Sequence, residues 1–190
     1  MELKDLKEED LATARNHGLF VLPTRDSGGR AVIFSRKPLW SFQHRNNLLR
    51  WIWYLAEELL DSDPSVQFKG VVVLSYDDGP YSLEQFDRKL ESRLFHFGIE
   101  CFPVRWVSLH HFFDSKVHEY VLPFLLFMMG PKMRARYRFY PGGLKRHHRL
   151  TALDALGLSK DLLPIVMGGK EEFDVMDWIK DQKRKEGLQD

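Results

Sequence analysis

Histidine is the residue type in this chain with the widest choice of chemistry, because a neutral imidazole binds metal ions and also exchanges protons near neutral pH. His110, His111 and His118 are close in sequence, and His147 and His148 follow as a second group. Zinc sites usually add cysteines or a His-Glu-x-x-His motif, whereas this chain has a single cysteine and no such motif. We therefore expect no metal ion.

Two carboxylates stand where an α/β enzyme could use them. Asp77 and Asp78 directly follow an apolar run, and ligands gather at the carboxyl ends of parallel strands. Gly79 and Pro80 come next, so turn formation is the preferred interpretation of both aspartates. The chain has no Gly-x-Ser-x-Gly, Gly-x-x-x-x-Gly-Lys-Ser/Thr or Gly-x-Gly-x-x-Gly motif. We expect no catalytic residue, no cofactor and a protein that is not an enzyme.

The sharpest contrast in polarity falls between residues 120 and 153. Tyr120 to Met129 has no charged residue, and the next twenty-four residues hold seven Lys or Arg and no Asp or Glu. Ten apolar residues are too few to span a bilayer, which takes about 20. The basic segment suits a lipid headgroup or an anionic membrane surface, and the two features together favour a lipid ligand. The alternative is a module that binds nucleic acid or another anionic partner through residues 132–149.

Composition limits the remaining possibilities. The chain has 190 residues, with 28 Lys and Arg against 27 Asp and Glu. Cys101 cannot form an internal disulfide, and the first residues do not resemble a signal peptide, so we expect a cytoplasmic monomer with peripheral membrane contact at most. We expect a charged helix or remnant extension at 1–17, a single domain at 18–185 and a tail at 186–190.

Hydrophobic patterning predicts the elements of the first half. Apolar runs at 18–22 and 31–34 flank turn residues and predict a hairpin. Apolar residues spaced by three or four predict a helix over 43–61. The continuous run at 70–76 predicts a strand buried on both faces. A helix follows, with a capping box of Ser82 and Gln85 and an end at Gly98, and then a strand over 103–109. This βαβ unit predicts a largely parallel sheet.

The second half is expected to hold the less regular elements. A helix begins after Asp114 and has a hinge at Pro123. Apolar and basic residues alternate over 132–140, which predicts an edge strand with one basic face. A short helix over 151–158, a short strand over 163–167 and a last helix over 171–185 complete the chain.

These motifs occur in an order that resembles a known family. They are Asp26-x-x-Gly29-Arg30-Ala31-Val32, the strand from Gly70 ending in Asp78-Gly79, Pro103-Val-Arg-Trp-Val, Pro123-Phe-Leu, and Leu163-Pro164 with Gly168-Gly169. The sequence resembles the CRAL-TRIO lipid-binding domain, the family of phosphatidylinositol-transfer and retinaldehyde- or tocopherol-binding proteins. The resemblance implies a mixed, largely parallel α/β sheet that floors an apolar pocket, a gate helix over it and one bound lipid without covalent chemistry.

An apolar pocket is also what a lipid carrier requires physically. Exposing an acyl chain to water costs about 0.8 kcal/mol per CH₂ group, or about 12 kcal/mol for a ~16-carbon chain. A carrier avoids this cost only if it encloses the chain. The resemblance places the gate near residues 112–129, where Tyr120, Leu125 and Leu126 are expected to face the membrane or form the gate. The residues expected to contact lipid are Tyr76, Trp106, Phe112, Phe113, Phe124, Phe127, Met128 and Met129.

The resemblance also suggests how a headgroup would be held. In the phosphoinositide-binding branch, a Glu before the strand at 103–109 and a basic residue after the gate contact the inositol phosphate. Glu100 and Arg136 fall at matching positions. We expect intermembrane transfer or sensing of one hydrophobic lipid, with phosphatidylinositol or a phosphoinositide among the candidates and the lipid's identity left open.

Overall fold

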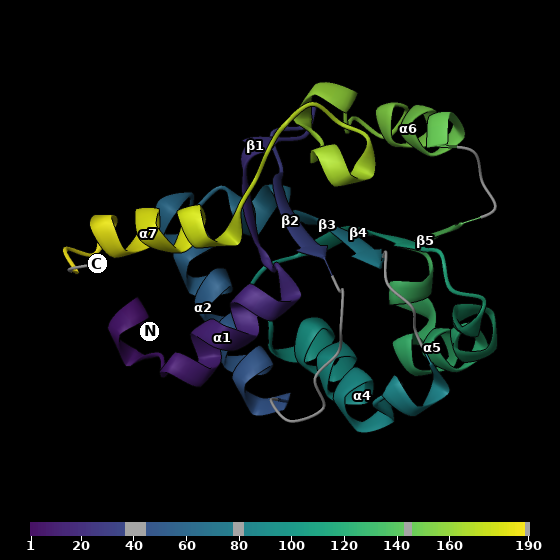
Figure 1. Ribbon diagram of the computed structural model, residues 1–190, viewed down its shortest axis with the longest axis horizontal. Coiled ribbons are helices and arrows are strands. Elements are labelled where there is room, and N and C mark those ends of the chain that lie inside the picture. Colours follow the sequence, from purple (N-terminus) through teal and green to yellow (C-terminus); the bar gives the residue numbers. More distant parts are fainter. Residues whose placement is uncertain (37–44, 78–81, 143–145, 189–190) are drawn as a thin grey trace.

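A computed structural model describes residues 1–36, 45–77, 82–142 and 146–188 as a five-stranded sheet with helices on both sides (Figure 1). The strands are β1 (Phe20–Arg25), β2 (Ala31–Arg36), β3 (Val71–Asp77), β4 (Trp106–Phe113) and β5 (Tyr137–Pro141). The α-helices are α1 (Glu8–His17), α2 (Arg45–Ser62), α3 (Val66–Lys69), α4 (Arg88–His96), α5 (Val117–Arg134), α6 (Arg146–Asp154) and α7 (Val175–Lys185).

The strands lie in the order in which they occur along the chain, β1-β2-β3-β4-β5. β1 and β2 are antiparallel, and every later pair is parallel. The predicted hairpin, the βαβ unit of β3, α4 and β4, and the largely parallel α/β sheet are therefore confirmed. The expected helix over 43–61 is present as α2, although residues 43 and 44 lie outside the described part of the chain.

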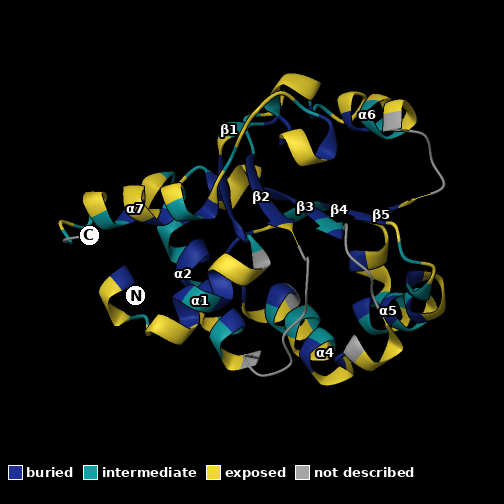
Figure 2. Ribbon diagram, viewed as in Figure 1, coloured by how far each residue is buried: buried dark blue, intermediate teal, exposed yellow. Residues whose placement is uncertain are grey.

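The core lies on both faces of the sheet, as the dark ribbon of the strands in Figure 2 shows. Val71 to Leu74 of β3 are all buried, which is the burial expected for an uninterrupted apolar run in a central strand. α4 and α5 lie on one side of the sheet, and α6 lies on the other (Figure 1). The side chains of successive strand residues alternate between these two environments.

The start and end of α4 differ from the prediction. Leu83–Gln85 forms a separate 3₁₀ turn, so Ser82 and Gln85 do not begin the helix. Asp87 is the N-cap instead, because its Oδ1 accepts hydrogen bonds from the backbone N–H groups of Lys89 and Leu90, both at 3.1 Å. At the other end the chain continues as a π-helical turn, Phe97–Cys101, and the helix does not stop at Gly98.

The predicted hinge at Pro123 is wrong. α5 continues through Pro123, and its backbone leaves the helical region only at Gly130, with φ 67° and ψ 171°. Gly130 precedes Pro131, and a residue before proline is disfavoured in the helical conformation. Glycine accepts this geometry at the lowest cost because it has no side chain.

Two predicted strands also have different bounds or a different structure. Lys132 to Arg134 belong to α5, so the predicted strand over 132–140 is reduced to β5. Met133 is buried, as Leu125 and Met129 are, but it lies in the short helical segment after the break at Gly130. Residues 163–167 form a 3₁₀ turn, Ile165–Met167, with one isolated bridge between Pro164 and Glu171.

Candidate functional site

An apolar cavity of ≈ 130 Å³ lies between the sheet and helices α2 and α4. Four strands supply its floor, through Ile33, Val73, Leu109 and Tyr137. These residues are register partners or near neighbours on adjacent strands, so their side chains share one face of the sheet. The walls are contributed by Leu48, Ile52, Leu55, Leu94, Phe95, Phe102 and Trp106.

Few polar groups reach this cavity. Ser35 and Ser75 lie on the floor, and Glu91 of α4 lies on the wall. The site therefore has the character of most small-molecule pockets, in which an apolar lining carries a small number of polar groups that fix orientation.

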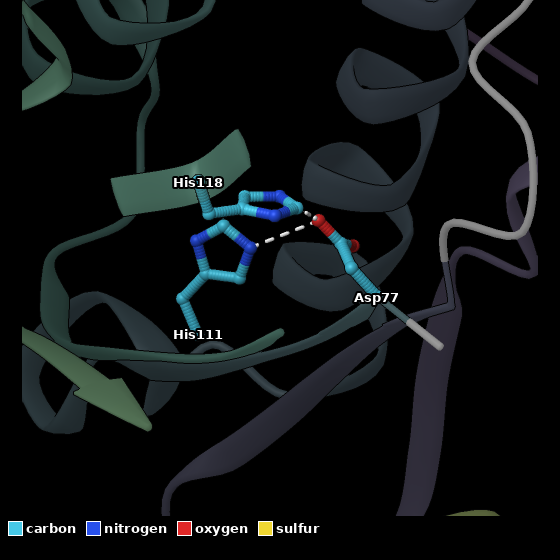
Figure 3. A group of neighbouring side chains, drawn as sticks. All are labelled: Asp77, His111 and His118. Atoms are coloured by element: carbon cyan, nitrogen blue, oxygen red, sulfur yellow. Dashed lines mark hydrogen bonds and ion pairs between the residues drawn. The ribbon is translucent and has the colours of Figure 1, made fainter. Parts of the chain in front are cut away.

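A buried polar cluster continues from the cavity along the same face of the sheet. We call it the Asp77 cluster: Asp77 at the end of β3, His111 of β4, His118 of α5 and Tyr137 of β5 (Figure 3 shows the first three). Asp77 Oδ2 lies 3.0 Å from Nε2 of His111 and 3.0 Å from Nε2 of His118. The Tyr137 hydroxyl lies 2.7 Å from Nδ1 of His111, and Tyr137 also lines the cavity.

Burial sets the protonation of the tyrosine in this cluster. Desolvation raises the pKa of Tyr137 well above its ordinary value, so its hydroxyl keeps its proton and can donate or accept a hydrogen bond. Asp77 is not the surface turn former that the sequence suggested: it is 4% exposed and ends a strand. Asp78 lies outside the described residues.

A second hollow lies on the opposite face of the sheet. It has a volume of ≈ 690 Å³ and is open to solvent, and its lining includes Tyr76, Phe112, Asp114 and Arg149. Arg149 forms an ion pair with Asp114 at 3.2 Å. The polar lining makes this hollow a poor container for a hydrocarbon chain.

His110 is buried beside this face. Its Nδ1 lies 2.9 Å from the Tyr140 hydroxyl, and its Nε2 lies 3.0 Å from the Ser108 hydroxyl. Desolvation and, to a smaller extent, the positive charge of Arg138 lower the pKa of His110 from 6.5 to about 4. The imidazole is therefore neutral at physiological pH.

The residues expected to contact lipid are distributed over several environments. Trp106 lines the cavity, whereas Tyr76 and Phe112 line the hollow on the opposite face. Phe113 stacks on His118, with ring centroids 4.8 Å apart. Phe124 packs edge-on against Phe86 at 5.6 Å. Phe112 and Phe113 belong to β4 and not to the gate region, because the strand extends four residues beyond its predicted end.

α5 divides the remaining predicted residues by helical face. Leu125 and Met129 are buried against the core, and Leu126 and Met128 are half-buried. Tyr120 and Phe127 are 76% and 79% exposed. Because they are seven residues apart, they share the solvent side of the helix.

The two predicted headgroup residues lie outside the cavity lining. Glu100 is exposed in the π-helical turn and lies 3.4 Å from Nδ1 of His96. Arg136 is half-buried between α5 and β5, and its carbonyl oxygen accepts a hydrogen bond from the backbone N–H of Leu109 at 3.0 Å. A headgroup bound by both side chains would thus lie outside the ≈ 130 Å³ cavity.

The basic segment does not form one continuous surface element. Lys132 and Arg134 end α5, Arg138 lies on β5, and Arg149 belongs to α6 on the other side of the sheet (Figure 1). The alternative of a nucleic-acid site over 132–149 would need these charges on one face. Among the described residues, no helix is both long and apolar enough to cross a membrane.

Sequence reasoning missed the Asp77 cluster. A strand predicted to end at residue 109 left His111 outside the sheet, and a turn at residues 77–80 left Asp77 at the surface. The available signal was Phe112 and Phe113, whose aromatic side chains favour continuation of the strand through His110 and His111. An extended β4 brings His111 beside the carboxyl end of β3.

No model of a known protein family matches this sequence, and no curated protein matches it either. Its three-dimensional structure is similar to the crystal structure of Sfh5, with a TM-score of 0.59 and 12% sequence identity. The similarity covers 97% of this chain and 68% of the Sfh5 chain. The shared architecture agrees with the fold that the sequence motifs implied. The chain therefore has the CRAL-TRIO fold.

Proposed function

We propose that this protein binds one hydrophobic lipid in the cavity between the sheet and helices α2 and α4, and exchanges it at a membrane surface. The main support for the proposal is the apolar cavity whose floor is the sheet of a CRAL-TRIO fold. Its lining is mainly aliphatic and aromatic, which suits a hydrocarbon chain better than a polar metabolite.

The volume of the cavity implies movement on binding. At ≈ 130 Å³ it is smaller than the 300–1,000 Å³ (roughly) of typical ligand pockets, so it holds only part of a lipid as it stands. Entry of a whole chain requires α4, which lines the cavity, to move away from the sheet, and α5, which packs against α4, to move with it. α5 is suited to this role because its backbone already departs from helical geometry at Gly130.

The exposed side of α5 supports exchange at a membrane. Tyr120 and Phe127 present aromatic rings to solvent, and Lys132 and Arg134 follow at the end of the same helix. Aromatic rings insert at the interface of a bilayer, and each cation near an anionic leaflet adds about 1 kcal/mol of attraction. In this proposal α5 is the gate, and the protein performs no covalent chemistry on the lipid.

Native mass spectrometry of the intact, purified chain tests the proposal. We expect a population that carries one additional mass, which organic extraction releases and identifies as a lipid. Transfer of that lipid class between vesicles should then exceed the spontaneous rate. Protein that retains no lipid, takes up none from vesicles and transfers none would contradict the proposal.

A further inference from the structure

We propose that Asp77, His111 and His118 bind a divalent transition-metal ion, with Zn²⁺ as the reference case. The ligand atoms are Asp77 Oδ2 and the Nε2 atoms of the two histidines, and these atoms all lie within 4.8 Å of one another. This site goes beyond lipid binding, and it does not depend on an occupant of the cavity.

The distances fit a shared ion. Zn–N and Zn–O bonds of about 2.0–2.2 Å place neighbouring tetrahedral ligand atoms about 3.3 Å apart. Asp77 Oδ2 lies 3.0 Å from each Nε2, so both pairs are already near that separation. Figure 3 shows both rings turned toward the same carboxylate oxygen.

The second nitrogen of each ring supports the assignment. Nδ1 of His118 lies 3.3 Å from the carbonyl oxygen of Ser115, and Nδ1 of His111 lies 2.7 Å from the Tyr137 hydroxyl. A carbonyl only accepts, so this contact is a hydrogen bond in the tautomer of His118 that carries its proton on Nδ1. In a neutral ring, Nε2 then presents a lone pair toward Asp77. Metal-binding histidines are oriented in this way, with the outer N–H held by a carbonyl or a similar acceptor.

Charge and burial favour a cation at this position. The side chains of Asp77, His111 and His118 are only 5–6% exposed. A carboxylate removed from water is costly unless a positive charge accompanies it. A divalent ion held by Asp77 and the two imidazoles would supply that charge.

The donor set also limits the kind of ion. Two imidazole nitrogens and one carboxylate oxygen suit Zn²⁺ or Fe²⁺ better than Mg²⁺ or Ca²⁺, which prefer oxygen ligands. Three protein ligands leave at least one position for water. The residues come from the end of β3, the end of β4 and the first turn of α5, so the ion would tie the start of the gate helix to the sheet.

Calorimetric titration of chelator-treated protein with Zn²⁺ tests the site. We expect one ion per wild-type chain. His111→Gln and His118→Gln should each weaken binding by more than about 100-fold, and Tyr137→Phe, which removes only the outer hydroxyl, by about 10- to 100-fold. The matched control is the double variant His147→Gln/His148→Gln, because these exposed rings lie 4.1 Å apart and could bind Zn²⁺ at the surface.

The outcomes of this titration distinguish a metal site from a cluster that is held together by hydrogen bonds alone. One site that survives in the double control and is lost in His118→Gln supports the metal assignment. Absence of Zn²⁺ binding to folded wild-type protein, or equal affinity in wild type and His118→Gln, overturns it and leaves only hydrogen bonds between Asp77 and the two histidines. For any variant that does not fold by circular dichroism, the visible spectrum of Co²⁺ bound to wild-type protein decides instead. Intense four-coordinate bands support the site, and their absence overturns it.

Discussion

Asp26 illustrates a polar residue whose role is to build a turn. It is 5% exposed, and its Oδ1 accepts hydrogen bonds from the backbone N–H groups of Gly28 and Arg30 at 2.9 and 2.8 Å. Its Oδ2 accepts from Nε of Arg30 at 2.6 Å. The Asp-x-x-Gly-Arg motif between β1 and β2 is therefore explained by the hairpin connection itself.

Replacing Asp26 should destabilise the whole domain. Asp26→Ala leaves two backbone donors and one guanidinium without their carboxylate, which we expect to lower the free energy of unfolding by about 2–4 kcal/mol in urea titrations. The control is Asp181→Ala, which removes an exposed ion pair with Arg184 and should cost about 0–1 kcal/mol. Equal losses in the two variants would show that the turn network contributes nothing specific.

His110 predicts a pH dependence of stability. Its pKa is about 4 in the folded protein against 6.5 for the free side chain, so the unfolded chain binds a proton more readily. The contribution of the neutral His110 ring to the free energy of unfolding is fully present above pH 6.5. It decreases as the pH falls toward 4, by up to ~1.4 kcal/mol per pH unit. We expect His110→Gln to have a shallower decline than wild type over this range.

The comparison that isolates this effect is thermal or urea unfolding at several pH values for wild type, His110→Gln and His147→Gln. His147 is exposed, and its replacement should leave the wild-type slope unchanged. If wild type and His110→Gln lose stability in parallel between pH 6.5 and 4, burial does not suppress the protonation of His110.

At the scale of elements, α5 combines two faces with different roles. His118, Val121, Leu125, Met129 and Met133 are buried, and the opposite side carries the exposed rings of Tyr120 and Phe127. The role proposed for the exposed rings therefore has to be tested by replacing them.

We expect the exposed aromatic rings of α5 to govern contact with membranes. The double variant Tyr120→Ser/Phe127→Ser should bind anionic vesicles at least about tenfold more weakly in a sedimentation assay, because each buried ring contributes about 1.5–3 kcal/mol. Phe68→Ser is the matched control, since Phe68 is 81% exposed but lies on α3. Equal vesicle binding by all three proteins would exclude α5 as the contact surface.

The sequence predicts the regular elements well and the junctions between them poorly. The apolar run at 71–74 and the spacing of Leu48, Trp51, Leu55 and Leu59 are signals that local patterning determines, and both were interpreted correctly. The Pro123 hinge failed because tertiary packing of Leu125 and Met129 outweighs the missing backbone donor. The length of β4 depends on its pairing with β3 and β5, which is not a local property.

The candidate site was predictable only in its general character. An apolar cavity over the sheet followed from the motif order, and Trp106, which was expected to contact lipid, lines that cavity. Its contact with lipid stays a prediction. Side chains from β2, α2 and α4, such as Ile33, Ile52 and Leu94, were not selected, because only the folded chain brings them together. Within the Asp77 cluster, Asp77 and His118 are 41 positions apart in the sequence. No rule of residue spacing would have connected them.

The whole molecule is a sheet with two unlike faces. One face carries the apolar cavity and the Asp77 cluster under α4 and α5, and the other carries the more polar hollow. The proposed lipid site lies on the apolar face, and variants that block each face separately can test its location.

Equilibrium binding of a fluorescent fatty acid to two phenylalanine variants tests the central claim most directly. Val73 lies on the floor of the cavity, and Val166 lines the hollow on the opposite face. Val73→Phe should occupy the empty space at a cost of about 1 kcal/mol or less in stability, and should weaken fatty-acid binding at least about tenfold. Val166→Phe should bind as wild type does. Unchanged affinity in folded Val73→Phe, or loss of binding only in Val166→Phe, would contradict a lipid site between the sheet and helices α2 and α4.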